Sequence, residues 1–183
     1  MVMTIAVLAL GAVAVLWYAS TYNALVGARN ATGQSWSDVE VELKRRLDLI
    51  GNLVETTKGY AQHERDVFEK VAALRGNARF GSAAEANAAE GATSQVLGRL
   101  MAVAESYPQL KADARFQQLH TDLTDTENRI AGRREAYNQT VNQYANLAQS
   151  APSNVVANLH RFEPKEFFKA PPEADAPPRV SFT

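Results

Sequence analysis

The chain has 183 residues, of which 46% are hydrophobic and 21% are charged, and its 19 basic and 20 acidic side chains give a net charge of −1. This length and composition predict one globular domain with room for a short additional element, and the balanced charge argues against a nucleic-acid-binding protein. The sequence contains no cysteine, which excludes disulfides, thiolate catalysis and cysteine-ligated metals.

The N-terminal segment 2–19, VMTIAVLALGAVAVLWYA, carries no charge and ends in Trp17 and Tyr18. As a helix it would rise ~27 Å, enough to cross a hydrocarbon core, and Trp17 and Tyr18 are amphipathic aromatics that favour the membrane interface. A cleaved signal peptide is the alternative, but no Lys or Arg precedes the run, and Trp17 disrupts the small-residue pattern ahead of Ser20. We therefore expect an uncleaved transmembrane anchor over residues 1–20.

The basic residues around this segment predict its orientation. None precedes it, whereas Arg29 and then Lys44, Arg45 and Arg46 follow it. Positive charge is retained on the cytoplasmic side of a membrane. The sequence therefore predicts a single-pass membrane protein, with its N-terminus outside and its C-terminal domain in the cytoplasm.

Helical periodicity begins after the anchor, first within residues 42–64. The apolar positions recur at alternating steps of four and three, which is the coiled-coil-like seam of a bundle helix. This seam comprises Leu43, Leu47, Ile50, Val54, Thr57 and Ala61. Gly59 and the polar run from Gln62 indicate that the helix ends near them.

A second helical region is predicted from about residue 64 to residue 107. Its apolar positions are Val67, Phe68, Val71, Leu74, Val96, Leu97, Leu100 and Val103. Glycine and alanine dilute the pattern over residues 75–92, where a kink, a loop or a close helix approach remain open alternatives. Pro108 ends the region, because a residue before proline avoids the helical conformation.

The third helix has the clearest pattern, and keeps the same rhythm over residues 116–148. Its seam comprises Phe116, Leu119, Leu123, Thr126, Ile130, Arg133, Tyr137, Val141, Tyr144 and Ala148, with Arg133 as the one charged member. Pro152 follows the helix, and Ser153 or Asn154 is expected to cap a short fourth helix that ends at Leu159.

The C-terminal segment 161–183 holds five of the seven prolines, which favours an extended polyproline conformation. A disordered tail is one interpretation, but Phe162, Phe167, Phe168 and Phe182 make partial packing on the helices plausible. Together these patterns predict an all-α protein, an antiparallel up-and-down bundle of three long helices and one short helix behind a transmembrane helix. The predicted divisions are the anchor (1–20), the bundle (21–160) and the proline-rich tail (161–183).

A charged stripe lies opposite the seam of the first helix. At 100° per residue, Arg45, Asp48, Asn52 and Glu55 share one narrow face, and Lys58 flanks it. Such a stripe is either a solvated helix face or a docking surface for another protein. Periodicity alone leaves both interpretations open.

Polar side chains also flank the seam of the third helix: Glu127, Asn128, Arg133, Arg134 and Asn138. We interpret them as interhelical hydrogen-bond and ion-pair partners, because arginine suits two-pronged pairing with a carboxylate. Asp48 or Glu55 of the first helix are the expected acidic partners of Arg133 and Arg134.

The sequence contains no recognisable catalytic motif. His63-Glu64 resembles the start of a zinc-protease helix, but Val67 occupies the place of the second histidine. There is no glycine-rich phosphate loop and no GxSxG motif. We therefore expect neither enzymatic activity nor a cofactor or metal.

Several segments together resemble the LemA family of bacterial membrane proteins. They are YNALVGARN (22–30), SWSDVEVELKRRLDLIGNLVETTKGYAQHE (35–64), ENRIAGRREAYN (127–138) and PPRVSF (177–182). The resemblance implies a single N-terminal anchor and a cytoplasmic bundle of long helices, but no reaction. The chain departs from the family pattern at three positions: Gly51 stands where proline is usual, Ala151 where phenylalanine is usual, and Arg161 where glycine is common.

These observations support three functional hypotheses. The first is a membrane-anchored scaffold that binds another membrane or cytoplasmic protein through the charged stripe. The second is a self-assembling, membrane-shaping protein whose rod-like copies pack side by side. The third, an enzyme or metal protein that uses His63 and Glu64, has the least support.

Overall fold

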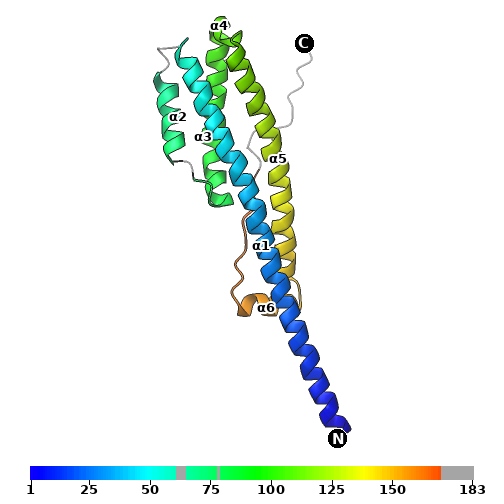
Figure 1. Ribbon diagram of the computed structural model, residues 1–183. Helices are drawn as coiled ribbons and strands as arrows, with labels where there is room; N and C mark the ends of the chain where they lie inside the picture. The colour runs from blue at the N-terminus through cyan, green and yellow to red at the C-terminus, as the bar shows by residue number, and fades with distance from the viewer. Residues whose placement is uncertain (61–64, 78, 170–183) are drawn as a thin grey trace, which may run out of the picture.

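The computed structural model describes residues 1–60, 65–77 and 79–169. Within these ranges the regular elements are all helices, so the predicted all-α class is confirmed (Figure 1). They are α1 (Val2–Lys58), α2 (Arg65–Asn77), α3 (Ala83–Ser106), α4 (Pro108–Lys111), α5 (Ala114–Gln149) and α6 (Ser153–Leu159). Residues 163–169 run back along the bundle in an extended conformation, and we call them the strap.

The two longest helices, α1 and α5, lie side by side and antiparallel (Figure 1). Their direction is evident from the paired positions: Thr32 of α1 contacts Thr140 of α5, whereas Arg46 contacts Glu127. The helices α2 and α3 pack beside the half of α1 that is remote from the N-terminus, and α4 makes the turn into α5.

The predicted seams form the core of this bundle. On α1 the seam residues Leu43, Leu47, Ile50, Val54 and Thr57 are buried, while Ala61 lies outside the described residues. The seam of α5 is buried from Phe116 to Tyr144 except at Leu119, which is half-buried, and at Arg133, which is exposed.

The helix ends follow the local sequence chemistry. Helix α1 ends at Gly59, as predicted, and α3 ends before Tyr107, since Pro108 starts a new turn. The Asp113 carboxylate accepts a hydrogen bond from the Phe116 N–H at 2.9 Å and so caps α5. The Ser82 hydroxyl caps α3 by accepting from the Glu85 N–H at 3.3 Å.

The region from 64 to 107 is two helices, because residues 79–82 leave the helical conformation before Ser82 caps α3. Of the alternatives left open for residues 75–92, the structure therefore has the loop. The expected cap of the short fourth helix is wrong. The start of α6 has no side-chain cap, since the Ser153 hydroxyl instead donates to the carbonyl oxygens of Leu147 and Ser150.

Helix α1 continues unbroken through residue 20, where we expected the anchor to meet the bundle. Its N-terminal part is long and apolar enough to cross a membrane, and none of its most apolar eighteen-residue window is buried in the rest of the protein. The side chains become buried from Leu25 onward. One helix is therefore both the exposed apolar segment and the central helix of the bundle.

Candidate functional site

The five stripe residues, Arg45, Asp48, Asn52, Glu55 and Lys58, are all exposed on α1. Within the stripe, Lys58 Nζ lies 2.7 Å from Glu55 Oε1. Asp48 forms an ion pair with Arg75 of α2, with 3.8 Å between the carboxylate oxygen and the guanidinium nitrogen. Exposed pairs of this kind contribute ~0–1 kcal/mol to stability, so the stripe is a solvent-facing surface with little structural role.

A groove of ≈ 600 Å³ adjoins the stripe between α1 and the loop that leads from α2 to α3. Glu40, Lys44 and Asp48 line it from α1, while Arg75 and Arg79 line it from the other side. The groove therefore presents both signs of charge beside the stripe, and this arrangement suits a partner with a matching alternation of charges.

The polar residues of α5 do not pair with the stripe, so the expected pairing with Asp48 or Glu55 is wrong. Arg133 instead lies 3.2 Å from Asp38 of α1, at an exposed pair. The reason is the register of the two helices. The antiparallel α5 brings Arg133 beside Asp38 of α1, and Asp38 lies about three helical turns before Asp48. Arg134 is half-buried and Asn128 is exposed.

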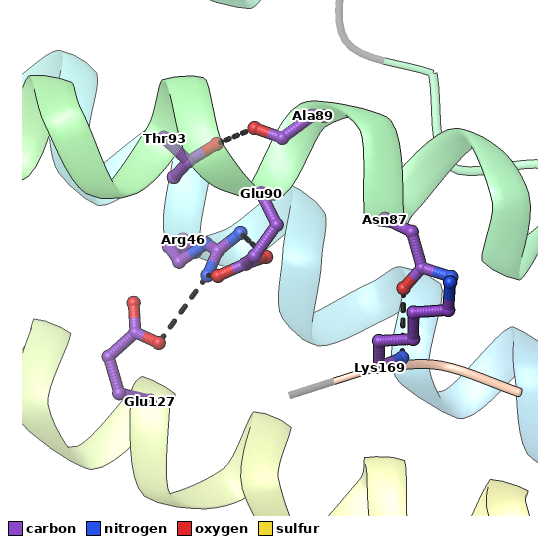
Figure 2. Close-up of polar contacts among 7 residues, drawn as sticks. All are labelled: Arg46, Asn87, Ala89, Glu90, Thr93, Glu127 and Lys169. Atoms are coloured by element: carbon purple, nitrogen blue, oxygen red, sulfur yellow. Dashed lines mark hydrogen bonds and ion pairs between the residues drawn. The ribbon is translucent and has the colours of Figure 1, made fainter. Parts of the chain in front are cut away.

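Glu127, which we expected to be an interhelical partner, lies half-exposed at the edge of a cluster around Arg46 and Glu90, and these two residues were not singled out from the sequence. Figure 2 shows Arg46 of α1 reaching between Glu90 of α3 and Glu127 of α5. Its guanidinium donates two hydrogen bonds to Glu90, at 3.0 and 2.8 Å, and one to Glu127 at 3.4 Å. The Arg46 residue is only 1% exposed, so one cation joins three helices inside the core.

The cluster holds two carboxylates against one cation. Burial opposes the charge of Arg46, but the hydrogen bonds and negative charge of Glu90, with those of Glu127, outweigh it and hold the Arg46 pKa above its ordinary value. Burial raises the pKa of Glu127, and the charge of Glu90 adds to this effect, while Arg46 offsets it only in part. Among the described residues, Arg46 Nε and Glu127 Oε1 are buried without a hydrogen-bond partner. Glu127 is therefore easier to protonate than an ordinary exposed glutamate.

A second group of side chains holds the strap, and it includes Asn138, which we expected to bind another helix. The amide of Asn138 donates to the Phe168 carbonyl oxygen and accepts from the Phe168 N–H, both at 2.9 Å. Asn87 makes the same kind of two-pronged contact with Phe167 and Lys169, and its bond to Lys169 is visible in Figure 2. These amides bind backbone atoms, so they hold the strap whatever its side chains are.

Phe168 anchors the strap through its ring. It is 2% exposed and packs edge-on against Trp36, with ring centroids 5.8 Å apart. The neighbouring Phe167 is 47% exposed. Partial packing of the tail was thus the better interpretation for residues up to 169, whereas Phe182 lies outside the described residues.

The predicted interface aromatics lie where α6 crosses α1. Trp17 and Tyr18 are 40% and 37% exposed. The Tyr18 hydroxyl forms a short hydrogen bond with the His160 ring, and the Tyr22 ring lies 4.7 Å from the same histidine. This aromatic group closes the end of the bundle next to the exposed apolar part of α1.

The described residues contain no group of three or more metal-ligating side chains. The weak motif His63-Glu64 lies outside the described residues.

Comparison with known proteins identifies the family. The LemA family model matches residues 35–182. The chain is 32% identical to magnetosome protein MamQ 2 of Paramagnetospirillum magneticum, over 85% of this chain and 67% of that protein. It is 30% identical to magnetosome protein MamQ of Magnetospirillum gryphiswaldense over the same shares. The chain belongs to the LemA family.

Proposed function

We propose that the protein is a membrane-anchored helical interaction module of the bacterial inner membrane. Residues 2–19 cross the bilayer with the N-terminus outside, and the cytoplasmic bundle binds a protein partner through the stripe. The observation that carries this proposal is the exposure of the apolar part of α1, where Leu8 and Leu16 are 74% and 70% exposed. Transfer of each such side chain out of water is favourable by ~1.5–3 kcal/mol, and insertion into a bilayer removes the whole segment from water.

The stripe supports the second half of the proposal. Its charges are exposed, their ion pairs are weak, and the mixed-charge groove extends the surface onto the start of α3. Buried Arg46, only one residue from Arg45, already supplies the polar link between the helices. The stripe is therefore not needed to hold the bundle together and is available for a partner.

The test is crosslinking and co-purification from native membranes with the triple variant Arg45→Ala, Asp48→Ala, Glu55→Ala. We expect the variant to melt as the wild type does, because it removes only exposed pairs, and to lose one specific protein. The matched control is Glu105→Ala, Arg115→Ala, Asp125→Ala, which changes the same number of exposed acidic and basic residues elsewhere.

An unchanged set of recovered proteins with the stripe variant would refute docking at the stripe. Loss of the same protein with the control variant would show that the effect is general charge removal. Recovery of further copies of this chain, in place of a different protein, would support the self-assembly alternative.

A further inference from the structure

Helix α6 packs one face on the end of the bundle. Val156 and Ala157 are 0% and 2% exposed, and they contact Leu25 of α1 together with Leu147 and Ala148 at the end of α5. Figure 1 shows α6 lying across α1 at the end of the bundle from which the N-terminal segment projects. The buried face of α6 therefore looks toward the bundle.

The opposite face of α6 is apolar and exposed. Val155 and Leu159 lie four positions apart, on one side of the helix, and are 65% and 68% exposed. Val156 and Ala157 carry the contacts with the end of the bundle, so Val155 and Leu159 are left open to the surroundings. Their place on the chain, close to the exposed apolar part of α1, suggests what covers them.

The contacts of His160 fix the height of this face along α1. His160 follows Leu159 directly and meets the Tyr18 hydroxyl and the Tyr22 ring. Tyr18 closes the uncharged run, and the first charged residue of α1 is Arg29, whose guanidinium lies over the Phe162 ring at 5.3 Å. Leu159 thus lies next to the residue that meets α1 at the level where the uncharged run ends.

We propose that α6 is a membrane-seating helix, whose Val155 and Leu159 insert into the boundary between headgroups and acyl chains around the base of α1. The occupant of this face is the lipid surface itself, and the inference rests on the proposed membrane anchor. An amphipathic helix buries its apolar side in this boundary, aromatic residues such as Tyr18 and Tyr22 favour the same depth, and exposed Arg161 lies beside anionic headgroups. The protein then meets the membrane at two places instead of one.

The absence of cysteine makes a direct test simple, because single cysteines can be introduced into the full chain and labelled with an environment-sensitive fluorophore. The positions are Leu8, Val155 and Leu159, with Lys165 of the strap as the exposed control. The labelled proteins are reconstituted in vesicles of phosphatidylcholine and phosphatidylglycerol that carry quenchers at shallow or deep positions in the acyl chain. None of these substitutions touches the core.

We expect quenching at Val155 and Leu159 by the shallow quencher, quenching at Leu8 by the deep quencher, and neither at Lys165. Quenching at Leu8, with Val155 and Leu159 as accessible to water as Lys165, would overturn the seating of α6 and leave the anchor standing. Water exposure at Leu8 would overturn the anchor as well. As a second measurement, Val155→Ser, Leu159→Ser should increase the hydrogen exchange of α6 amides in vesicles relative to the wild type; equal exchange of the variant and the wild type in vesicles would contradict the inference.

Discussion

Arg46 and Glu90 are separated by 44 positions in the chain, yet they form a buried two-pronged ion pair that joins α1 to α3. A charge left in a protein interior without its partner costs far more than a broken surface pair. Replacing one member of this pair should therefore destabilise the protein strongly.

Replacing Arg46 by Met should lower the free energy of unfolding by ~3–5 kcal/mol, because Glu90 and Glu127 would lose their cation. Urea unfolding followed by circular dichroism measures this loss. The matched control is the exposed neighbour, Arg45→Met, which should stay within ~0.5 kcal/mol of the wild type. Adding Glu90→Leu to Arg46→Met should recover part of the loss; equal effects of the two arginine variants would contradict the cluster.

Glu127 should give the protein a measurable dependence on pH. Its pKa is raised in the folded state, so the folded protein binds this proton more tightly than the unfolded chain does. The stabilising contribution is complete below the ordinary Glu pKa of ~4.3 and is lost as the pH rises through the raised pKa.

The measurement is the difference in unfolding free energy between the wild type and Glu127→Gln across this range. The wild type should lose stability relative to the variant as the pH rises. Asp113 has a lowered pKa and acts in the opposite direction, but it is common to both proteins and cancels in the difference. Parallel curves would show that Glu127 titrates alike in the folded and unfolded states.

Two adjacent phenylalanines of the strap should behave differently. Phe168→Ala empties a buried site beside Trp36, so the strap should leave the bundle more often. Trypsin should then cut after Lys165 faster, by roughly tenfold for each 1.4 kcal/mol lost. Phe167→Ala, at an exposed position, is the control and should leave the cleavage rate near that of the wild type. Similar rates for both variants would mean that the Phe168 ring does not anchor the strap.

Replacing Arg161 by glycine, the residue that the family resemblance implies at this position, should stabilise the protein. The φ of Arg161 is 52°, the left-handed region, and it ends α6 with the hydrogen bonds Phe162 N to Ala157 O and Arg161 N to Asn158 O. This is the motif in which glycine is favoured. Arg161→Gly should raise stability by ~1 kcal/mol, detected as a higher melting temperature. Arg161→Ala keeps the Cβ atom and should show no such gain; a gain of the same size would point to charge removal instead.

Much of the fold could be predicted from the sequence because it depends on local chemistry. Apolar spacing placed the third helix at 116–148, against Ala114–Gln149 in the structure, and Gly59 and Pro108 marked real helix ends. The split between α2 and α3 was one of three alternatives, and the sequence could not choose between them because a run of alanines fits a helix as well as a loop. The cap at Ser82 marks where α3 begins.

The buried cluster was missed for a different reason. Arg46 lies three positions after Leu43 and four before Ile50, and Glu90 lies four after Ala86 and three before Thr93, so both charges occupy seam positions. That signal was available in the sequence. Periodicity shows which face of a helix is buried, however, and not which helix it meets, so the pairing of Arg46 with Glu90 and the register of Arg133 with Asp38 needed the fold.

Because α1 is one unbroken helix, it holds the bundle at a fixed distance from its N-terminal apolar part. From Leu25, the first buried residue, to Lys58 it rises ~50 Å. With residues 2–19 in a bilayer, the stripe would stand ~40–60 Å along the helix from the end of that segment. A partner that binds the stripe would have to extend that far from the membrane. Inserting one residue near position 21 would move the stripe only ~1.5 Å farther from the membrane but would turn it by ~100° around the helix axis. The direction in which the stripe faces is therefore far more sensitive to the length of α1 than its distance from the membrane is.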